Sequence, residues 1–291
     1  MQRQTQAYLY AGATVLCWST VATAFKLSLR HVGADALVFY SSLVSTGVLL
    51  CITLATGRLG QLREWRPGDL RTSLVLGFLN PFLYYVVLFR AYDVLPAQEA
   101  LTLNFTWPMV LALFSILLLG QPIRLGAVLA MGISFSGVAV IATRGDLFAL
   151  DLANPRGVAL ALGSTLIWTF YWIYGVKDGR DPVTRLLINF VFGCGFSGGF
   201  LWLSGAMETP APLGLAGAAY IGTFEMGIAF VTWLQALKLS RTTAQVGQLI
   251  YLTPFLSLLV IALVVGEPVY PSTLAGLALI IGGIVLQRRS G

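Results

Sequence analysis

The sequence predicts an all-α polytopic membrane protein, with ten transmembrane helices arranged as two inverted five-helix repeats and both termini in the cytoplasm. The apolar composition, the number of apolar stretches and an internal repeat lead to this prediction. Of the 291 residues, 57% are hydrophobic and 10% are charged, and the mean hydropathy is +0.82. Soluble domains carry about 25% charged residues. The composition therefore excludes a soluble enzyme, a disordered chain and a nucleic-acid binder.

The number of spans follows from the length of the apolar stretches, because a transmembrane helix needs about 20 mostly apolar residues. The first stretch contains Trp18 and Lys26 and ends without a small-residue cleavage site. We therefore expect it to remain as an uncleaved span rather than to act as a signal peptide. The connections are short, and no soluble domain is expected. The ten stretches lie near residues 6–26, 35–56, 71–91, 98–119, 123–142, 156–175, 184–204, 213–236, 242–265 and 271–287.

The placement of Lys and Arg indicates the orientation, because cytoplasmic loops carry an excess of both. If the N-terminus is cytoplasmic, 13 of the 18 Lys and Arg residues lie on the inner side of the membrane and the other 5 on the outer side. An even number of spans then places the C-terminus inside as well. The outer basic residues are Lys26, Arg30, Arg90, Arg144 and Arg156.

The two halves of the chain, residues 1–145 and 146–291, share a pattern. A Leu-x-Trp step occurs in "LCWST" at 16–20 and in "LIWTF" at 166–170. At an offset of 146 residues, Pro108 corresponds to Pro254, "GQP" to "GEP", and Gly137 to Gly283. Because five spans is an odd number, the second half is inverted relative to the first. Inverted repeats are a transporter architecture with a substrate site near the membrane midplane.

The segment "ALKLSRTTAQVGQLIYLTPFLSLLVIALVVGEPVYPSTLAGLALIIGGIVL" resembles the C-terminal half of an EamA-type repeat of the drug/metabolite transporter superfamily. The first half resembles it more loosely, since Gln121 stands where the second half has Glu267. The two repeats cover nearly the whole chain, and the resemblance implies a ten-helix exporter or permease of small metabolites. In overall length and aromatic-rich helices, the chain is similar to the YddG-type aromatic amino-acid exporters.

Glu225 is the most informative polar residue, because it lies midway through the eighth span with no charged residue within ten positions. Ionisable groups inside a bilayer are costly and usually face the bundle interior or a water-filled cavity. Glu225 is therefore a candidate to bind a substrate ammonium group or a coupling proton. The alternative is a neutral glutamic acid hydrogen-bonded to a neighbouring helix.

Aromatic and amide side chains are the remaining candidates for a cavity that binds an aromatic, partly charged solute. In the sixth span, three aromatic residues share one helical face at i, i+3 and i+4. The alternative is that these rings pack helices or anchor them at the interface, although Trp18, Trp107, Trp168 and Trp233 lie deep in their spans. Pro108 and Pro254, inside the fourth and ninth spans, are candidate conformational residues. The candidate substrate-binding residues are Glu225, Trp168, Tyr171, Trp172, Trp18, Asn80, Tyr84, Asn104, Trp107, Gln245, Gln248 and Tyr251.

The other charged or reactive side chains give weaker indications of a functional site. Lys26, Arg90 and Glu99 lie near span ends, where long side chains usually reach the membrane interface. The alternative is that they form part of the substrate site. The three cysteines sit apart in apolar stretches and are expected to be buried thiols. We expect no metal and no cofactor.

These features favour a secondary transporter in the bacterial inner membrane that exports aromatic or other bulky apolar amino acids by alternating access. The alternative is a broad-specificity exporter of other amino acids, metabolites or cationic drugs. A membrane-embedded enzyme fits less well, because such enzymes usually show a dense polar cluster and this chain has one His. The expected partners are a small-molecule substrate, an amino acid or related metabolite, and the lipid bilayer. No nucleic acid is expected, and the expected state is monomeric.

Overall fold

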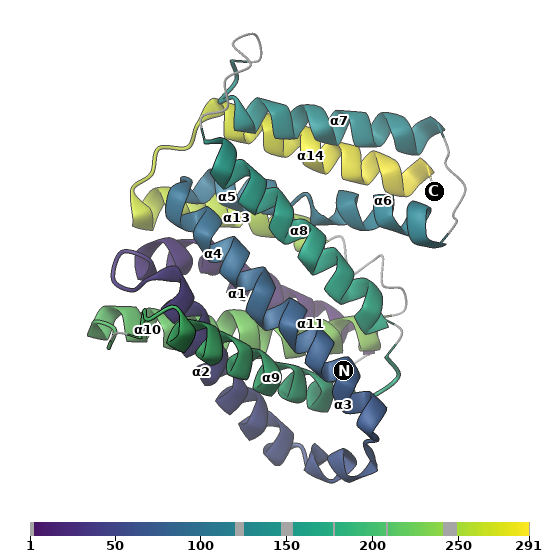
Figure 1. The fold of residues 1–291 in the computed structure, drawn as a ribbon. Helices are drawn as coiled ribbons and strands as arrows, with labels where there is room; N and C mark the ends of the chain where they lie inside the picture. Colours follow the sequence, from purple (N-terminus) through teal and green to yellow (C-terminus); the bar gives the residue numbers. More distant parts are fainter. Residues whose placement is uncertain are drawn as a thin grey trace.

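The computed structural model describes residues 3–119, 125–146, 154–176, 178–207, 209–240 and 249–290, and all regular elements in these ranges are helical (Figure 1). The first half contains α1 (Arg3–Ser28), α2 (Ala34–Ala55), α3 (Pro67–Gly77), α4 (Tyr84–Val94), α5 (Ala97–Asn104), α6 (Trp107–Leu119) and α7 (Leu125–Ala142). The second half contains α8 (Pro155–Val176), α9 (Pro182–Leu203), α10 (Pro212–Tyr220), α11 (Phe230–Leu239), α13 (Leu252–Val260) and α14 (Pro271–Ser290). The shorter segments are the 3₁₀ helices η1 (Arg58–Glu64) and η4 (Leu249–Tyr251) and the π-helices η2 (Phe78–Leu83), η3 (Ile221–Ala229) and η5 (Ile261–Val265).

Several helical segments are long and apolar enough to cross a membrane. The described residues contain 6 of them: Arg3–Ser28, Ala34–Ala55, Pro67–Val94, Pro155–Gly175, Pro182–Leu203 and Pro212–Leu239. Shorter apolar helices run over Gly132–Ala142, Leu249–Val265 and Pro271–Leu286. The protein is therefore a polytopic membrane protein. The count of ten spans and the side of the membrane that holds the termini stay predictions.

The segments Pro67–Val94 and Pro212–Leu239, the third and eighth of the predicted spans, are interrupted by π-helical segments. In η2, the backbone of Asn80 is extended, with φ −148° and ψ 122°. Pro81 follows it, and a proline cannot donate the N–H that a continuous helix requires. In the eighth span, η3 lies between α10 and α11 and contains Glu225. Single π-helical segments inside α-helices occur frequently at functional sites.

The fourth predicted span, residues 98–119, is not one helix. The helix α5 ends at Asn104 and α6 begins at Trp107, with a turn at Phe105 and Thr106 between them. Pro108 is thus the second residue of α6 rather than a residue inside a continuous span, because a proline without an N–H is tolerated in the first turn of a helix. Pro254 is the third residue of α13. The two prolines that the repeat pairs therefore lie in the first turns of α6 and α13, and α13 continues directly from η4.

The helices α7 and α14 lie side by side at one edge of the molecule (Figure 1, teal and yellow at the top). A methyl group added to Gly137 would lie 2.6 Å from the Gly276 carbonyl oxygen, and one added to Gly283 would lie 2.5 Å from that of Ala130. An offset of 146 residues exchanges these two contact pairs. The small residues of the repeat therefore let the two helix backbones approach closely.

A polar network joins the two halves where α5 begins. The backbone N–H of Ala97 donates to Oε2 of Glu267 at 2.8 Å, and Arg144 Nε donates to Oε1 of Glu99 at 2.8 Å. The hydrogen bond that Arg144 donates to Glu99 raises the pKa of the Arg144 guanidinium and outweighs burial, which would lower it. This end of the bundle is thus held by contacts between residues far apart in the sequence.

The charged residues near the span ends have protein partners. Lys26 Nζ donates to the backbone oxygens of Tyr92 and Leu95, at 2.9 and 2.8 Å. Arg90 Nη2 forms an ion pair with Asp35 at 2.9 Å. Together with Glu99, these residues connect helices outside the cavity described below.

Candidate functional site

A cavity lies between helices that come from both halves of the chain. Its volume is about 70 Å³, and most of its lining is apolar or aromatic, as in small-molecule binding sites. Of the described side chains that line it, only Glu225 is acidic or basic. The lining residues are Trp18, Val21, Phe25, Tyr84, Leu88, Tyr92, Leu101, Asn104, Phe105, Trp107, Trp168, Trp172, Glu225, Trp233, Ile250 and Thr253.

Corresponding positions of the two halves contribute to this lining. Trp18 and Trp168, the tryptophans of the two Leu-x-Trp steps, both line the cavity. At the offset of 146, Trp107 corresponds to Thr253 and Asn104 to Ile250, and these four residues line it as well. The repeat visible in the sequence therefore brings matching segments around one space, where their side chains differ in chemistry.

Glu225 is the ionisable group of this cavity. Its side chain is carried by η3, and the residue is 7% exposed. Oε1 accepts a hydrogen bond of 3.0 Å from the hydroxyl of Tyr85, whereas Oε2 has no hydrogen-bond partner in the described part of the chain. A buried polar atom without a partner costs about 1–3 kcal/mol. A ligand that donates a hydrogen bond to Oε2 would therefore be favoured.

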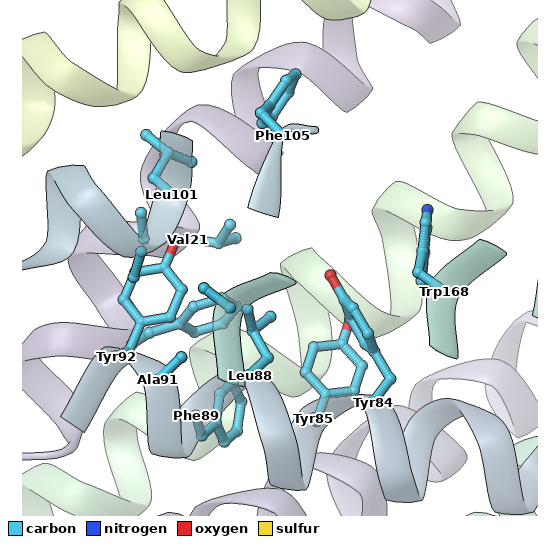
Figure 2. Close-up of a cluster of buried hydrophobic side chains, with 14 of the residues drawn as sticks. Val21, Tyr84, Tyr85, Leu88, Phe89, Ala91, Tyr92, Leu101, Phe105 and Trp168 are labelled. Carbon is cyan, nitrogen blue, oxygen red and sulfur yellow. The ribbon is translucent and has the colours of Figure 1, made fainter. Parts of the chain in front are cut away.

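Aromatic rings form most of the wall around Glu225. The ring of Trp168 lies 4.8 Å from that of Tyr84 and 5.6 Å from that of Phe230, and the rings of Trp18 and Trp233 are 5.8 Å apart, measured between centroids. Figure 2 shows the side chains of α4 facing Leu101 and Phe105 across the cavity, with Trp168 beside Tyr84. Such a wall offers flat apolar contact and cation–π surface to a ligand.

Several hydrogen-bond donors line the same cavity. Asn104 Nδ2 donates to Ser164 Oγ at 2.9 Å, so one amide group is held by a neighbouring helix. By contrast, the indole N–H groups of Trp18 and Trp172 and the hydroxyl of Thr253 are buried without a hydrogen-bond partner among the residues that the structure describes. The described lining thus combines one carboxylate, Glu225, with hydrogen-bonding groups that are all uncharged.

The structure brings together most of the side chains singled out in the sequence and leaves others apart. Asn80 is fully buried in η2 and does not line the cavity. Tyr171 stacks behind Trp168, with 5.9 Å between ring centroids, and Tyr251 is buried beside the lining residue Ile250. Gln245 and Gln248 lie outside the described residues. The candidates that do line the cavity are Glu225, Trp18, Tyr84, Asn104, Trp107, Trp168 and Trp172.

Sequence reasoning left Tyr85 and Thr253 out of the candidate substrate-binding residues. Tyr85 is fully buried and holds Glu225, but its neighbour Tyr84 has the same side chain, so composition does not distinguish them. Thr253 was detectable, because it precedes Pro254 and corresponds to Trp107 at the repeat offset. That offset is the signal that finds it.

A family model and several known proteins match this chain over most of its length. The model of the EamA-like transporter family matches residues 5–143 and 155–288. The aromatic amino acid exporter YddG of Ancylobacter novellus is 28% identical over 288 residues, covering 96% of both chains. An uncharacterized transporter of Bacillus subtilis, YvbV, is 27% identical and covers 97% of this chain and 92% of its own. A probable terminal-alkyne amino-acid exporter of Streptantibioticus cattleyicolor is 26% identical, covering 95% and 91%.

One solved crystal structure has the same fold over almost the whole length. It superposes with a TM-score of 0.69 at 25% sequence identity and covers 98% of this chain and 97% of its own.

Proposed function

Since the chain belongs to the EamA-like transporter family, we propose that it is a secondary transporter that exports aromatic or other bulky apolar amino acids from a bacterial cell. In this proposal, residues 1–145 and 146–291 form two inverted repeats of five spans each, in the inner membrane with both termini in the cytoplasm. Two observations support the inverted repeat. The family model matches the chain twice, and the close contacts between α7 and α14, Gly137 with Gly276 and Gly283 with Ala130, exchange at an offset of 146 residues.

The free oxygen of Glu225 inside an aromatic cavity is the observation that carries the substrate proposal. An ammonium group is a donor that fits Oε2, and a hydrogen bond to a charged group contributes about 1.5–3 kcal/mol. The rings of Trp18, Trp168 and Trp172 would pack against the side chain of the substrate. A relative that is named as an aromatic amino acid exporter supports the same substrate class.

Transport would proceed by alternating access, in which the two repeats exchange their arrangements around the cavity. Pro108 and Pro254 lie in the first turns of α6 and α13, next to the lining residues Trp107 and Thr253, and we propose that these turns act as the points of bending. Glu225 would carry a coupled proton when no substrate ammonium is bound. Facilitated efflux without a coupled ion is the simpler form of the same mechanism.

A second candidate is a broad-specificity exporter of amines and cationic drugs. It is favoured by one observation: no Lys or Arg is found among the described lining residues, so a cationic ligand meets no repulsion there. An enzyme is disfavoured by the family and by the names of the relatives.

The test is uptake of labelled amino acids into proteoliposomes, with and without a pH gradient. Glu225→Gln keeps the shape of the side chain but removes its charge, so we expect tryptophan and phenylalanine transport to fall at least about tenfold, as the loss of a charge-assisted hydrogen bond implies. The exposed Glu64→Gln serves as the matched control and should transport like the unaltered protein. Export kinetics of Glu225→Gln that stay unchanged across pH would remove this residue from the mechanism.

A further inference from the structure

The amide group of Asn104 has a fixed orientation beside the cavity. Its Nδ2 donates to Oγ of Ser164 at 2.9 Å, and Ser164 Oγ donates in turn to the backbone oxygen of Ala161 at 2.6 Å. A serine hydroxyl has a single proton, and here that proton is used on Ala161. Ser164 can therefore only accept from Asn104, so the amide nitrogen faces Ser164 and the amide oxygen Oδ1 faces the opposite way.

The oxygen Oδ1 is on the cavity side of this amide group. Ser164, the partner of Nδ2, is fully buried and does not line the cavity. Tyr84 does line it, and its hydroxyl donates to Asn104 Oδ1 at 3.4 Å. A hydrogen bond of this length is weak, and an amide oxygen accepts more than one hydrogen bond. Oδ1 is therefore available as an acceptor for a ligand in the cavity.

The carboxylate of Glu225 is oriented in a similar way. Tyr85, which is fully buried outside the lining, donates to Oε1 at 3.0 Å, and Oε2 is left without a partner among the described residues. Tyr84 and Tyr85 are consecutive residues of α4 with ring centroids 4.8 Å apart, and Figure 2 shows their hydroxyl groups on the same side of that helix. The two acceptors, Asn104 Oδ1 and Glu225 Oε2, therefore lie in the same part of the cavity.

Two oriented acceptors distinguish between kinds of cation. A quaternary ammonium group has no N–H and is recognised by aromatic faces and by opposite charge. A primary ammonium group carries several N–H donors, as a lysine side chain does, and needs a corresponding number of acceptors. The aromatic wall and one carboxylate would suit either kind of cation. A second acceptor beside the carboxylate adds a contact that only an N–H group can make.

We propose that Asn104 Oδ1 and Glu225 Oε2 together receive the primary ammonium group of the substrate, and that Ser164 is the positioning residue that turns Oδ1 to the cavity. This inference rests on the proposed function and narrows it: the transporter selects solutes with a primary ammonium group over their quaternary ammonium counterparts. Amino acids and primary amines are thereby separated from quaternary cationic drugs.

The experiment measures the Kd of L-tryptophan and of N,N,N-trimethyl-L-tryptophan for the purified full-length protein in detergent. The two ligands share the ring, the carboxylate and the positive charge, but only tryptophan has ammonium N–H groups. We expect the unaltered protein to bind tryptophan at least about tenfold more tightly. Asn104→Leu removes the acceptor and keeps a similar shape, so it should weaken tryptophan binding about tenfold and leave binding of the trimethyl compound within about twofold.

Ser164→Ala tests the positioning role without changing a residue of the cavity lining. The Asn104 amide loses the partner that fixes it, and we expect tryptophan binding to weaken about fivefold while binding of the trimethyl compound stays the same. Asn189→Leu is the matched control for Asn104→Leu, because Asn189 is a fully buried amide of α9 that is absent from the described lining and has no partner for Nδ2 or Oδ1 in the described ranges. It should leave both affinities within about twofold.

Equal affinities of the unaltered protein for the two compounds would overturn the inference and leave amino-acid binding in place. Equal weakening of both compounds by Asn104→Leu or Ser164→Ala would refute it too, because these residues would then support only the shape of the cavity. Tryptophan binding that neither variant weakens would assign the selectivity to the bulk of the trimethyl group. If the unaltered protein binds neither compound, the proposed function fails, and this inference fails with it.

Discussion

The third and eighth spans, Pro67–Val94 and Pro212–Leu239, have the same layout in the two halves of the molecule. Each has 28 residues, and each consists of a helix, a π-helical segment and a second helix. At an offset of 145 residues, Asn80 in η2 corresponds to Glu225 in η3. Glu225 lines the cavity, whereas Asn80 does not. The same interruption therefore presents a carboxylate to the cavity in one half and is packed against protein in the other.

Close packing holds the segment η2 in the third span. A methyl group added to Gly193 of α9 would meet the Pro81 ring and lie 3.0 Å from the Gly77 carbonyl oxygen. The start of the third span is held as well, because Arg180 Nη1 donates to the Asp69 backbone oxygen at 2.8 Å and to Ser73 Oγ at 3.0 Å. A methyl group added to Gly222 of η3 would likewise lie 2.4 Å from the Ser41 backbone oxygen of α2. The comparison teaches that both interrupted segments are packed closely and that they differ in whether the polar side chain reaches the cavity.

The largest expected effect is on the close packing of the third span. Gly193→Val would push against the rigid ring of Pro81, and overpacking of this kind costs about 1–3 kcal/mol. We expect a clear fall in the thermal unfolding temperature in detergent. Gly195→Val is the matched control on the same helix, since an added methyl group there meets no described atom within 4 Å. Equal stability of the two variants would contradict the close approach of α9 and η2.

A smaller effect is expected at the contact that supports the start of the third span. Arg180 Nε donates to Asp178 Oδ1 at 2.8 Å. Burial alone would raise the pKa of Asp178, but the hydrogen bonds and charge of Arg180 outweigh it, so the pKa lies below its usual value. Asp178→Asn should cost about 1 kcal/mol at neutral pH, in the range of buried hydrogen bonds to charged groups and ion pairs.

The pH dependence follows from the direction of that shift. A carboxyl group whose pKa is lowered on folding stabilises the protein above its unfolded pKa, and this contribution disappears as the pH falls through the lowered folded value. The difference in unfolding temperature between the unaltered protein and Asp178→Asn should therefore be constant near neutral pH and shrink in acid. A difference that grows in acid would show that Asp178 is not stabilised by Arg180.

The smallest effect is expected for Asn80, the counterpart of Glu225. Neither amide atom of Asn80 has a hydrogen-bond partner among the described residues, although the Tyr171 hydroxyl lies nearby. Replacing an unpartnered buried polar group by an apolar one of similar shape is close to neutral. We expect Asn80→Leu to keep its stability and its transport rate within about twofold. A tenfold loss of transport in the folded variant would give Asn80 the substrate contact that the sequence predicts.

Much of the site was accessible from the sequence. Glu225 stood out because a charged residue inside an apolar span is costly, and Trp18 and Trp168 because the repeat pairs them deep in their spans. Asn80 and Tyr171 were selected by the same kind of reasoning, yet they lie outside the cavity lining. The face of a helix that meets the cavity depends on where π-helical segments and turns change its rotation, and single-residue patterns do not show this.

The sequence by itself determined that the chain lies in a membrane and that its two halves match, since span length, hydropathy and a constant offset are properties of residue order. Only the tertiary structure decided which member of each matching pair faces the cavity. Asn80 and Glu225 occupy corresponding positions, and a helix packs against each segment, α9 against η2 and α2 against η3, but only Glu225 lines the cavity. The physical reason is that the rotation of a helical segment about its axis, and so the side chain that it turns to the cavity, is set by contacts between residues distant in the chain.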